Sequence, residues 1–114
     1  FMSACLGAAA SADHLGVHAY FNSTTAPLPT ALAVVDGYIA QVPNKPILVT
    51  EASNNQSGNA EIMSTDYVTF WQELRRRPRV QGVMYFVCNA SNPQFAPELW
   101  TPRQLGAKVR AKMP

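Results

Sequence analysis

The sequence predicts an α/β domain in which three parallel strands alternate with helices. Apolar runs bounded by turn residues indicate the strands, at residues 15–21, 46–51 and 80–88. Between these runs, apolar residues recur at helical spacing. The chain has 114 residues, 47% hydrophobic and 14% charged, which is enough for one packed domain spanning residues 1–114. Such alternation is typical of a parallel sheet with right-handed crossovers.

The first half of the chain supplies two helices and a strand. Small apolar residues at 1–12 fit the end of a helix, and residues 15–21 form the first strand. A loop rich in threonine and proline follows at 22–29. The next helix is predicted by five apolar residues at helical spacing: Leu32, Val35, Tyr38, Ile39 and Val42. The segment 43–46, which contains two prolines, ends that helix.

The second half repeats this pattern. The strand at 46–51 ends on Glu51 and is followed by a polar loop. The clearest helix is predicted by an i, i+3, i+4, i+7 stripe formed by Tyr67, Phe70, Trp71 and Leu74. Pro78 ends this helix, the third strand occupies 80–88, and a loop at 89–100 follows.

A last helix is predicted from its first residues. Thr101 is suited to the N-cap, Pro102 to the first helical position and Gln104 to the third. Leu105 and Val109 lie at the spacing of an inward face.

Polar and aromatic residues gather where each predicted strand ends. The carboxyl ends of parallel strands share one edge, where such folds place their chemistry. Glu51 ends a strand expected to be buried on both faces, so it is the leading functional candidate. Residues two apart share a strand face, so His18, Tyr20 and Asn22 should point the same way. The complete set is His18, Tyr20, Asn22, Glu51, Asn54, Tyr85, Cys88, Asn89 and Asn92.

Three short motifs lie on the predicted strands: His18-Ala19-Tyr20, Ile47-Leu48-Val49-Thr50-Glu51 and Gly82-Val83-Met84-Tyr85-Phe86. They resemble the sixth, seventh and eighth strands of retaining (β/α)8-barrel glycoside hydrolases of the large cellulase-like clan. The resemblance spans nearly the whole chain. It implies a partial TIM barrel, made of the C-terminal three βα units of such an enzyme.

The resemblance also implies roles for single residues. Glu51 matches the catalytic nucleophile, and Tyr20 matches the tyrosine whose hydroxyl donates to that carboxylate and favours its charged form. His18 matches a residue of the site wall, and Tyr85 an aromatic that floors the sugar site. The other expected substrate contacts are Asn22, Asn54, Asn89 and Trp100. For Trp100 and for Phe95, which lies in the same loop region, anchoring of the loop is the competing interpretation.

A retaining glycosidase needs a second carboxyl group about 5–5.5 Å from the nucleophile. In the resembled family this acid/base glutamate lies on the fourth strand, usually after an asparagine, and no Asn-Glu pair occurs in the sequence. We therefore expect the isolated chain to be inactive. Three parallel strands would leave two edges and an inner face uncovered, so we also expect self-association or pairing with the missing half of the barrel.

Other functions remain open at this point. A part-barrel could serve as a non-catalytic carbohydrate-binding or assembly module. Another α/β enzyme could use Glu51 for acid–base work on a non-sugar substrate. Two further hypotheses have less support than these. One is a zinc site of His14, His18 and Glu51, and the other is a nucleophilic pair of Cys88 and His18. We expect neither a metal nor a cofactor.

Composition limits the partners. The net charge is +2, and no basic face recurs, so we expect a carbohydrate rather than a nucleic acid as the ligand. No apolar run approaches the length of a membrane span. The two cysteines, Cys5 and Cys88, show no metal-ligand spacing and are expected to be buried free thiols, although a disulfide stays possible. The localisation stays open, and a secreted or cell-surface parent is compatible with the sequence.

Overall fold

The computed structural model describes residues 2–21, 28–55 and 59–114. In chain order the elements are α1 (Met2–Ser11), β1 (Leu15–Phe21), α2 (Leu28–Gln41), β2 (Ile47–Asn54), α3 (Ala60–Leu74), β3 (Val80–Tyr85), the 3-10 helix η1 (Pro93–Glu98) and α4 (Leu105–Lys112). None of the described helices is long and apolar enough to cross a membrane.

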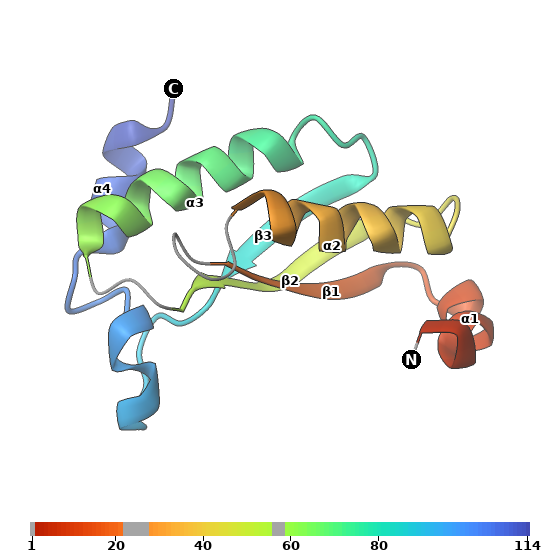
Figure 1. The fold of residues 1–114 in the computed structure, drawn as a ribbon, viewed down its shortest axis with the longest axis horizontal. Coiled ribbons are helices and arrows are strands. Elements are labelled where there is room, and N and C mark those ends of the chain that lie inside the picture. Colours follow the sequence, from red (N-terminus) through yellow and green to blue (C-terminus); the bar gives the residue numbers. More distant parts are fainter. Residues whose placement is uncertain (1, 22–27, 56–58) are drawn as a thin grey trace.

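The three strands form one sheet in the order β1-β2-β3, and both pairings are parallel. Figure 1 shows α2 and α3 lying along the same side of this sheet, which we call the helix face. The predicted fold class is therefore confirmed: three parallel strands alternate with helices in an open sheet, as in part of an α/β barrel.

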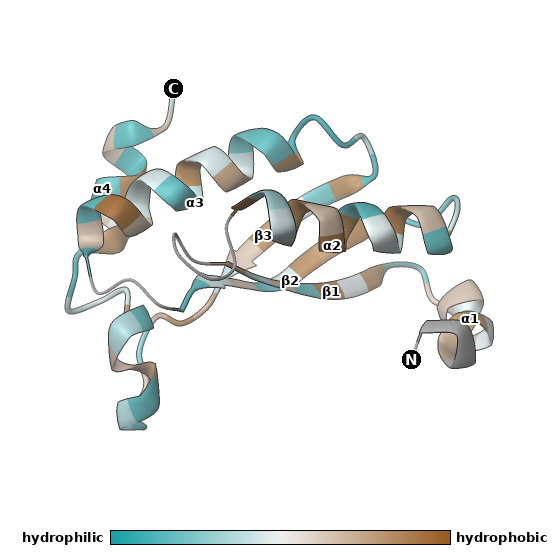
Figure 2. Ribbon diagram, viewed as in Figure 1, coloured by the Kyte–Doolittle hydropathy of each residue, from teal (hydrophilic) through white to brown (hydrophobic). Residues whose placement is uncertain are grey.

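The core lies between the helix face and the two long helices. Hydrophobic residues follow the strands and the helices above them (Figure 2). The strand contribution consists of Val17, Ala19, Phe21, Ile47, Val49 and Ala52, all buried. They pack against Val35 of α2 and against Tyr67 and Phe70 of α3 in one cluster. The rings of Phe21 and Phe70 lie 4.9 Å apart, which ties β1 directly to α3.

The opposite side of the sheet, which we call the inner face, is not covered in the described part of the chain. Along β1, buried residues of the helix face alternate with exposed residues of the inner face. On β3 the side chain of Met84 points to the inner face and is 53% exposed. The expectation of strands buried on both faces is therefore wrong for this chain, because helices cover one face alone.

A β-bulge interrupts β2 beside Glu51. Val17 pairs with Val49, but the next residue of β1, His18, pairs with Glu51, so Thr50 is an extra residue on β2. The Thr50 hydroxyl donates to the Val17 carbonyl at 3.3 Å. Thr50 and Glu51 are both half-buried, whereas Val49 before them and Ala52 after them are fully buried. The bulge thus lets two consecutive side chains point to the inner face.

Two strand ends differ from the sequence prediction. β2 continues three residues beyond Glu51 to Asn54, so Glu51 lies within the strand rather than at its last position. β3 ends at Tyr85, before the predicted residue 88, although the Phe86 N–H still donates to the Ala52 carbonyl at 2.9 Å.

The predicted cap of the last helix is also wrong. α4 begins at Leu105, and its N-cap is Gln104, which has a left-handed backbone (φ 53°) and no side-chain cap bond. The Thr101 hydroxyl donates instead to the Cys88 carbonyl at 2.9 Å. The residue suited to capping therefore closes the loop between β3 and α4.

The arginines after α3 tie that helix to α2. Arg77 forms a two-pronged ion pair with Asp36, at 2.6 and 2.7 Å. Arg79 donates to the carbonyls of Ile39 and Val42, at the C-terminal end of α2. These side chains thus fasten the two helices of the helix face at the end opposite Glu51.

Candidate active site

The candidate site lies on the inner face, toward the carboxyl ends of the strands. β1 contributes His18 and Tyr20, and β2 contributes Glu51 through the bulge. The Tyr20 hydroxyl donates a hydrogen bond to Glu51 Oε2. His18 Nδ1 lies 3.6 Å from the same oxygen. The structure therefore brings together the two residues expected to be catalytic and the histidine expected beside them.

The three side chains are accessible enough to meet a substrate. The side chain of Glu51 is 34% exposed and that of His18 is 56% exposed. Within residues 2–21, 28–55 and 59–114, both of these contacts of the carboxylate go to Oε2 and neither involves Oε1.

Tyr20 is held in its protonated, hydrogen-bond-donating form. Burial raises the pKa of Tyr20 well above its ordinary value of 10.0, the hydrogen bond to Glu51 raises it further, and the charges of Glu51 and Glu98 act in the same direction. A phenol that keeps its proton remains a donor across the neutral and mildly alkaline range, and its hydrogen bond fixes the orientation of the carboxylate.

An aromatic chain continues the site from Tyr20. The ring of Phe86 meets that of Tyr20 edge-on at 6.4 Å, and Phe95 of η1 meets Phe86 edge-on at 5.2 Å. The aromatic next to the Tyr20–Glu51 pair is therefore Phe86, not the predicted Tyr85. The motif Tyr85-Phe86 contains both residues, and only the strand parity decides between them.

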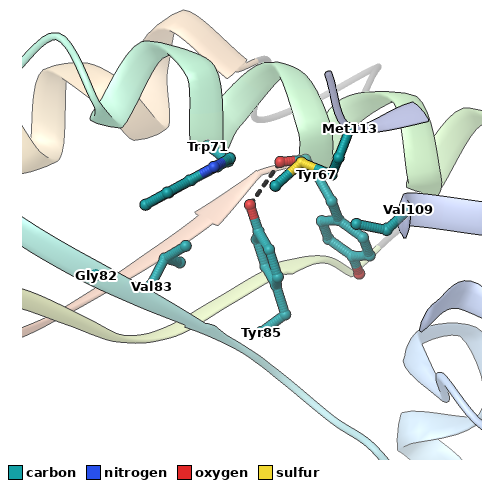
Figure 3. A pocket seen from close by; sticks show the side chains of 7 residues that line it. All are labelled: Tyr67, Trp71, Gly82, Val83, Tyr85, Val109 and Met113. Atoms are coloured by element: carbon teal, nitrogen blue, oxygen red, sulfur yellow. Dashed lines mark hydrogen bonds between the residues drawn. The ribbon is translucent and has the colours of Figure 1, made fainter. Parts of the chain in front are cut away.

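Tyr85 and Trp100 lie on the helix face. The Tyr85 hydroxyl donates to the Tyr67 carbonyl of α3 at 2.5 Å (Figure 3). Trp100 stacks on both tyrosines, with ring centroids 5.1 Å from Tyr67 and 5.5 Å from Tyr85. The structure thus places both predicted substrate contacts, Tyr85 and Trp100, in the packing between the sheet and the helices. This position makes Trp100 an anchor of the loop.

A cavity of about 270 Å³ adjoins these rings, between β3, α3 and α4. Its lining is mostly apolar and consists of Tyr67, Trp71, Gly82, Val83, Tyr85, Val109 and Met113 (Figure 3). The cavity lies on the opposite side of the sheet from Glu51, so it is not part of the candidate site.

Among the predicted asparagines, the described part of the chain places Asn54 away from Glu51. Asn54 is fully buried, and its amide donates to Asp66 of α3 at 2.6 Å, so it faces the helices. Its side chain points away from Glu51 because β2 continues to Asn54, and residues three apart in a strand face opposite sides. Asn89 is exposed in the loop after β3. Asn22 lies outside the described residues.

The metal and thiol alternatives gain no support from the geometry. His14 hydrogen-bonds Gln81 at 3.0 Å, at the amino ends of the strands, and is therefore separated from His18. Within the described ranges, no three histidine, cysteine or acidic side chains cluster as metal ligands. Cys5 and Cys88 are free, and Cys88 is exposed rather than buried as expected.

Glu98 is a carboxylate that sequence reasoning missed. It is only 6% exposed, and its Oε2 has no hydrogen-bond partner among the described residues. Its charge helps raise the pKa of Tyr20 and of Tyr67, although burial is the largest cause for both. No sequence signal identifies this position, because the loop around it has no regular pattern.

Comparison with known proteins identifies a glycosyl hydrolase family and a structure of similar fold. The family model described as glycosyl hydrolase catalytic core matches residues 1–106. Among solved structures, the chain is similar to the crystal structure of a GH128 (subgroup II) endo-β-1,3-glucanase from Sorangium cellulosum. The TM-score is 0.67 at 22% sequence identity, which is a likeness of fold.

The match to the glucanase covers 90% of this chain and 41% of that chain. The present chain thus spans less than half the length of that protein. A search of curated proteins gave no match. The family model extends over nearly every residue, and the chain belongs to the glycosyl hydrolase catalytic core family.

Proposed function

We propose that this chain carries the nucleophile half of the active site of a retaining glycoside hydrolase that cleaves a β-linked glucan. The observation that carries the proposal is the contact between the Tyr20 hydroxyl and Glu51 on the inner face. In a barrel that face is enclosed, and a sugar ring could lie against Glu51, with His18 and Phe86 beside it.

In this mechanism Glu51 attacks through Oε1, because Tyr20 and His18 occupy Oε2. The Oε1–anomeric carbon bond forms as the bond to the leaving oxygen breaks, and a general acid protonates that oxygen. Water then attacks the anomeric carbon, gives its proton to the same group, and releases Glu51 as a carboxylate. Two inversions leave the anomeric configuration unchanged.

The general acid is the part of this mechanism that we assign outside the chain. It has to lie about 5–5.5 Å from the nucleophile and reach the leaving group. Glu98 is only 6% exposed in this chain, which leaves it little surface with which to meet a leaving group. The proposal is supported by the 41% coverage of the glucanase, which leaves most of such a barrel to supply the acid. We therefore expect no hydrolysis of natural glucans by this chain alone. The rest of a barrel, or a second copy of the chain, would cover the inner face.

The first substrate to test is a β-1,3-linked glucan, the class named for the similar structure. A dinitrophenyl β-glucoside tests the nucleophile by itself, because its leaving group departs without protonation. Glu51→Ala should abolish release of dinitrophenol, and added azide should restore it by attacking in place of the carboxylate. One displacement by azide inverts the carbon, so the product should be the α-glucosyl azide.

The matched control is Glu61→Ala, which removes a carboxylate bound to Lys108 of α4, away from the inner face. This variant should release dinitrophenol at the wild-type rate, and with azide it should form the β-glucosyl azide, because Glu51 and then azide displace in turn and two displacements retain the configuration. Binding of β-glucan by the wild-type chain without any release of dinitrophenol would instead favour a non-catalytic carbohydrate-binding module.

A further inference from the structure

The loop between β3 and α4 is fixed at its base by backbone hydrogen bonds. The N–H groups of Trp100 and Thr101 donate to the carbonyls of Val87 and Cys88, both at 3.1 Å. Trp100 then anchors the loop by stacking on Tyr67 of α3. A compact loop closed in this way holds its tip in a defined place.

The tip of this loop is the helix η1, which carries Phe95. Asn92 caps η1, because its side-chain oxygen accepts from the Gln94 N–H at 3.1 Å. Arg103 donates to the Ala96 carbonyl from the other side. The Phe95 ring is thereby held against Phe86 at 5.2 Å, and it remains partly exposed.

Tyr20, Phe86 and Phe95 therefore form a continuous row of rings that starts at the nucleophile. Successive centroids are 6.4 and 5.2 Å apart, so Phe95 lies beyond the ring that contacts Tyr20. A pyranose offers C–H groups on its faces, and a rigid aromatic ring provides apolar area for them at little cost in conformational entropy. Phe86 meets the ring of Tyr20, the residue that bonds Glu51, whereas Phe95 is one ring farther away.

We propose that Phe95 is a specificity-determining residue that stacks on the sugar next to the one held at Glu51. It would make the site prefer glucan chains over single β-glucosides. This inference rests on the proposed function, because it needs a sugar at Glu51.

The test compares binding of two probes to the 114-residue chain. A β-1,3-linked glucose pentasaccharide reaches both positions, and methyl β-glucoside reaches the Glu51 position alone. In Phe95→Ala the pentasaccharide should bind roughly 2- to 10-fold more weakly, and methyl β-glucoside should bind as it does to the wild type. Phe95→Trp should keep the wild-type preference, because it keeps an aromatic face. Circular dichroism of each variant checks that it is folded.

The outcomes separate the two proposals. Equal binding of the pentasaccharide by wild type and Phe95→Ala would overturn the role of Phe95 and leave the proposed function intact. An equal loss for both probes would place Phe95 at the reacting sugar and overturn the neighbouring position. A wild-type chain that binds neither probe would overturn both proposals.

Discussion

The two faces of the sheet use the same three strands for different purposes. The helix face buries aliphatic and aromatic side chains under α2 and α3, and most of its strand residues are fully buried. The inner face carries a histidine, a tyrosine, a glutamate and an exposed methionine. We therefore expect stability to depend mainly on the helix face and the proposed chemistry on the inner face, which Glu51 joins through the bulge at Thr50.

The largest difference between the two faces is expected in the loss of folding stability when an apolar side chain is truncated. Phe70 of α3 is fully buried against Phe21, so Phe70→Ala should lower the free energy of unfolding by about 3–5 kcal/mol. Met84→Ala removes a 53% exposed side chain from the inner face and should change the free energy of unfolding by less than about 0.5 kcal/mol. Urea denaturation measures the free energy of unfolding of both variants. A similar loss of stability in Met84→Ala and Phe70→Ala would show that the inner face is covered in solution.

The predicted substrate asparagines provide the next contrast. Asn54→Ala removes a buried hydrogen bond to Asp66 and should cost about 1–3 kcal/mol of folding stability. Burial raises the pKa of Asp66 and the bond from Asn54 lowers it, so the pKa should rise further in this variant. Asn89→Ala is the matched control, because Asn89 is exposed, and it should unfold like the wild type. A stable Asn54→Ala that binds glucan poorly would instead return Asn54 to the site.

Tyr20 should lose its phenol proton at a higher pH than a tyrosine with the ordinary pKa of 10.0. The pKa of Tyr20 is raised in the folded chain, so its contribution to stability is fully present below pH 10.0, the ordinary pKa. Above that value the unfolded chain releases the phenol proton while the folded chain keeps it, and the contribution is lost. Ultraviolet titration of phenolate should show ionisation at lower pH in Glu51→Gln. Tyr20→Phe should remove the affected signal, and an unchanged titration in Glu51→Gln would contradict the hydrogen bond.

The smallest effect is expected at the ion pair between the two helices. Asp36 is half exposed, so Asp36→Asn should lower the free energy of unfolding by about 0.2–1 kcal/mol. The hydrogen bond from Arg77 lowers the pKa of Asp36, so this stabilisation is present above pH 3.8 and is lost as the pH falls through the folded pKa. Denaturation at neutral and acid pH tests this, and a difference that persists at low pH would exclude the ion pair as its cause.

The sequence was sufficient for the strands, the order of elements and the Tyr20–Glu51 pair. Strand periodicity and the position of a carboxylate near a strand end indicated the strands and Glu51, whereas the pairing with Tyr20 was implied by the resemblance to the glycoside hydrolases. The faces of Asn54 and Tyr85 were not predictable in the same way. The sequence predicted a loop after Glu51, whereas β2 continues to Asn54, and strand alternation turns Asn54 to the face opposite Glu51. For Tyr85, two adjacent aromatics fit the same motif.

The loop before α4 shows a different limit of sequence reasoning. Thr101 and Pro102 have the local chemistry of a helix start, yet the Thr101 hydroxyl bonds Cys88 across the loop. A tertiary contact of this kind competes with capping and is invisible in a local pattern. The same holds for Phe95 and Trp100, which lie in one loop but pack against different rings, Phe86 for Phe95 and Tyr67 for Trp100.

Covalent capture of the nucleophile tests the central claim most directly. A 2-deoxy-2-fluoro-β-glucosyl fluoride should form a stable adduct, because its leaving group departs without an acid and the fluorine slows release. Peptide mass spectrometry should locate one adduct on Glu51, formed more slowly in Tyr20→Phe. An adduct on Glu98 or another carboxylate, or a wild-type chain that binds glucan and remains unlabelled, would contradict the assignment of Glu51.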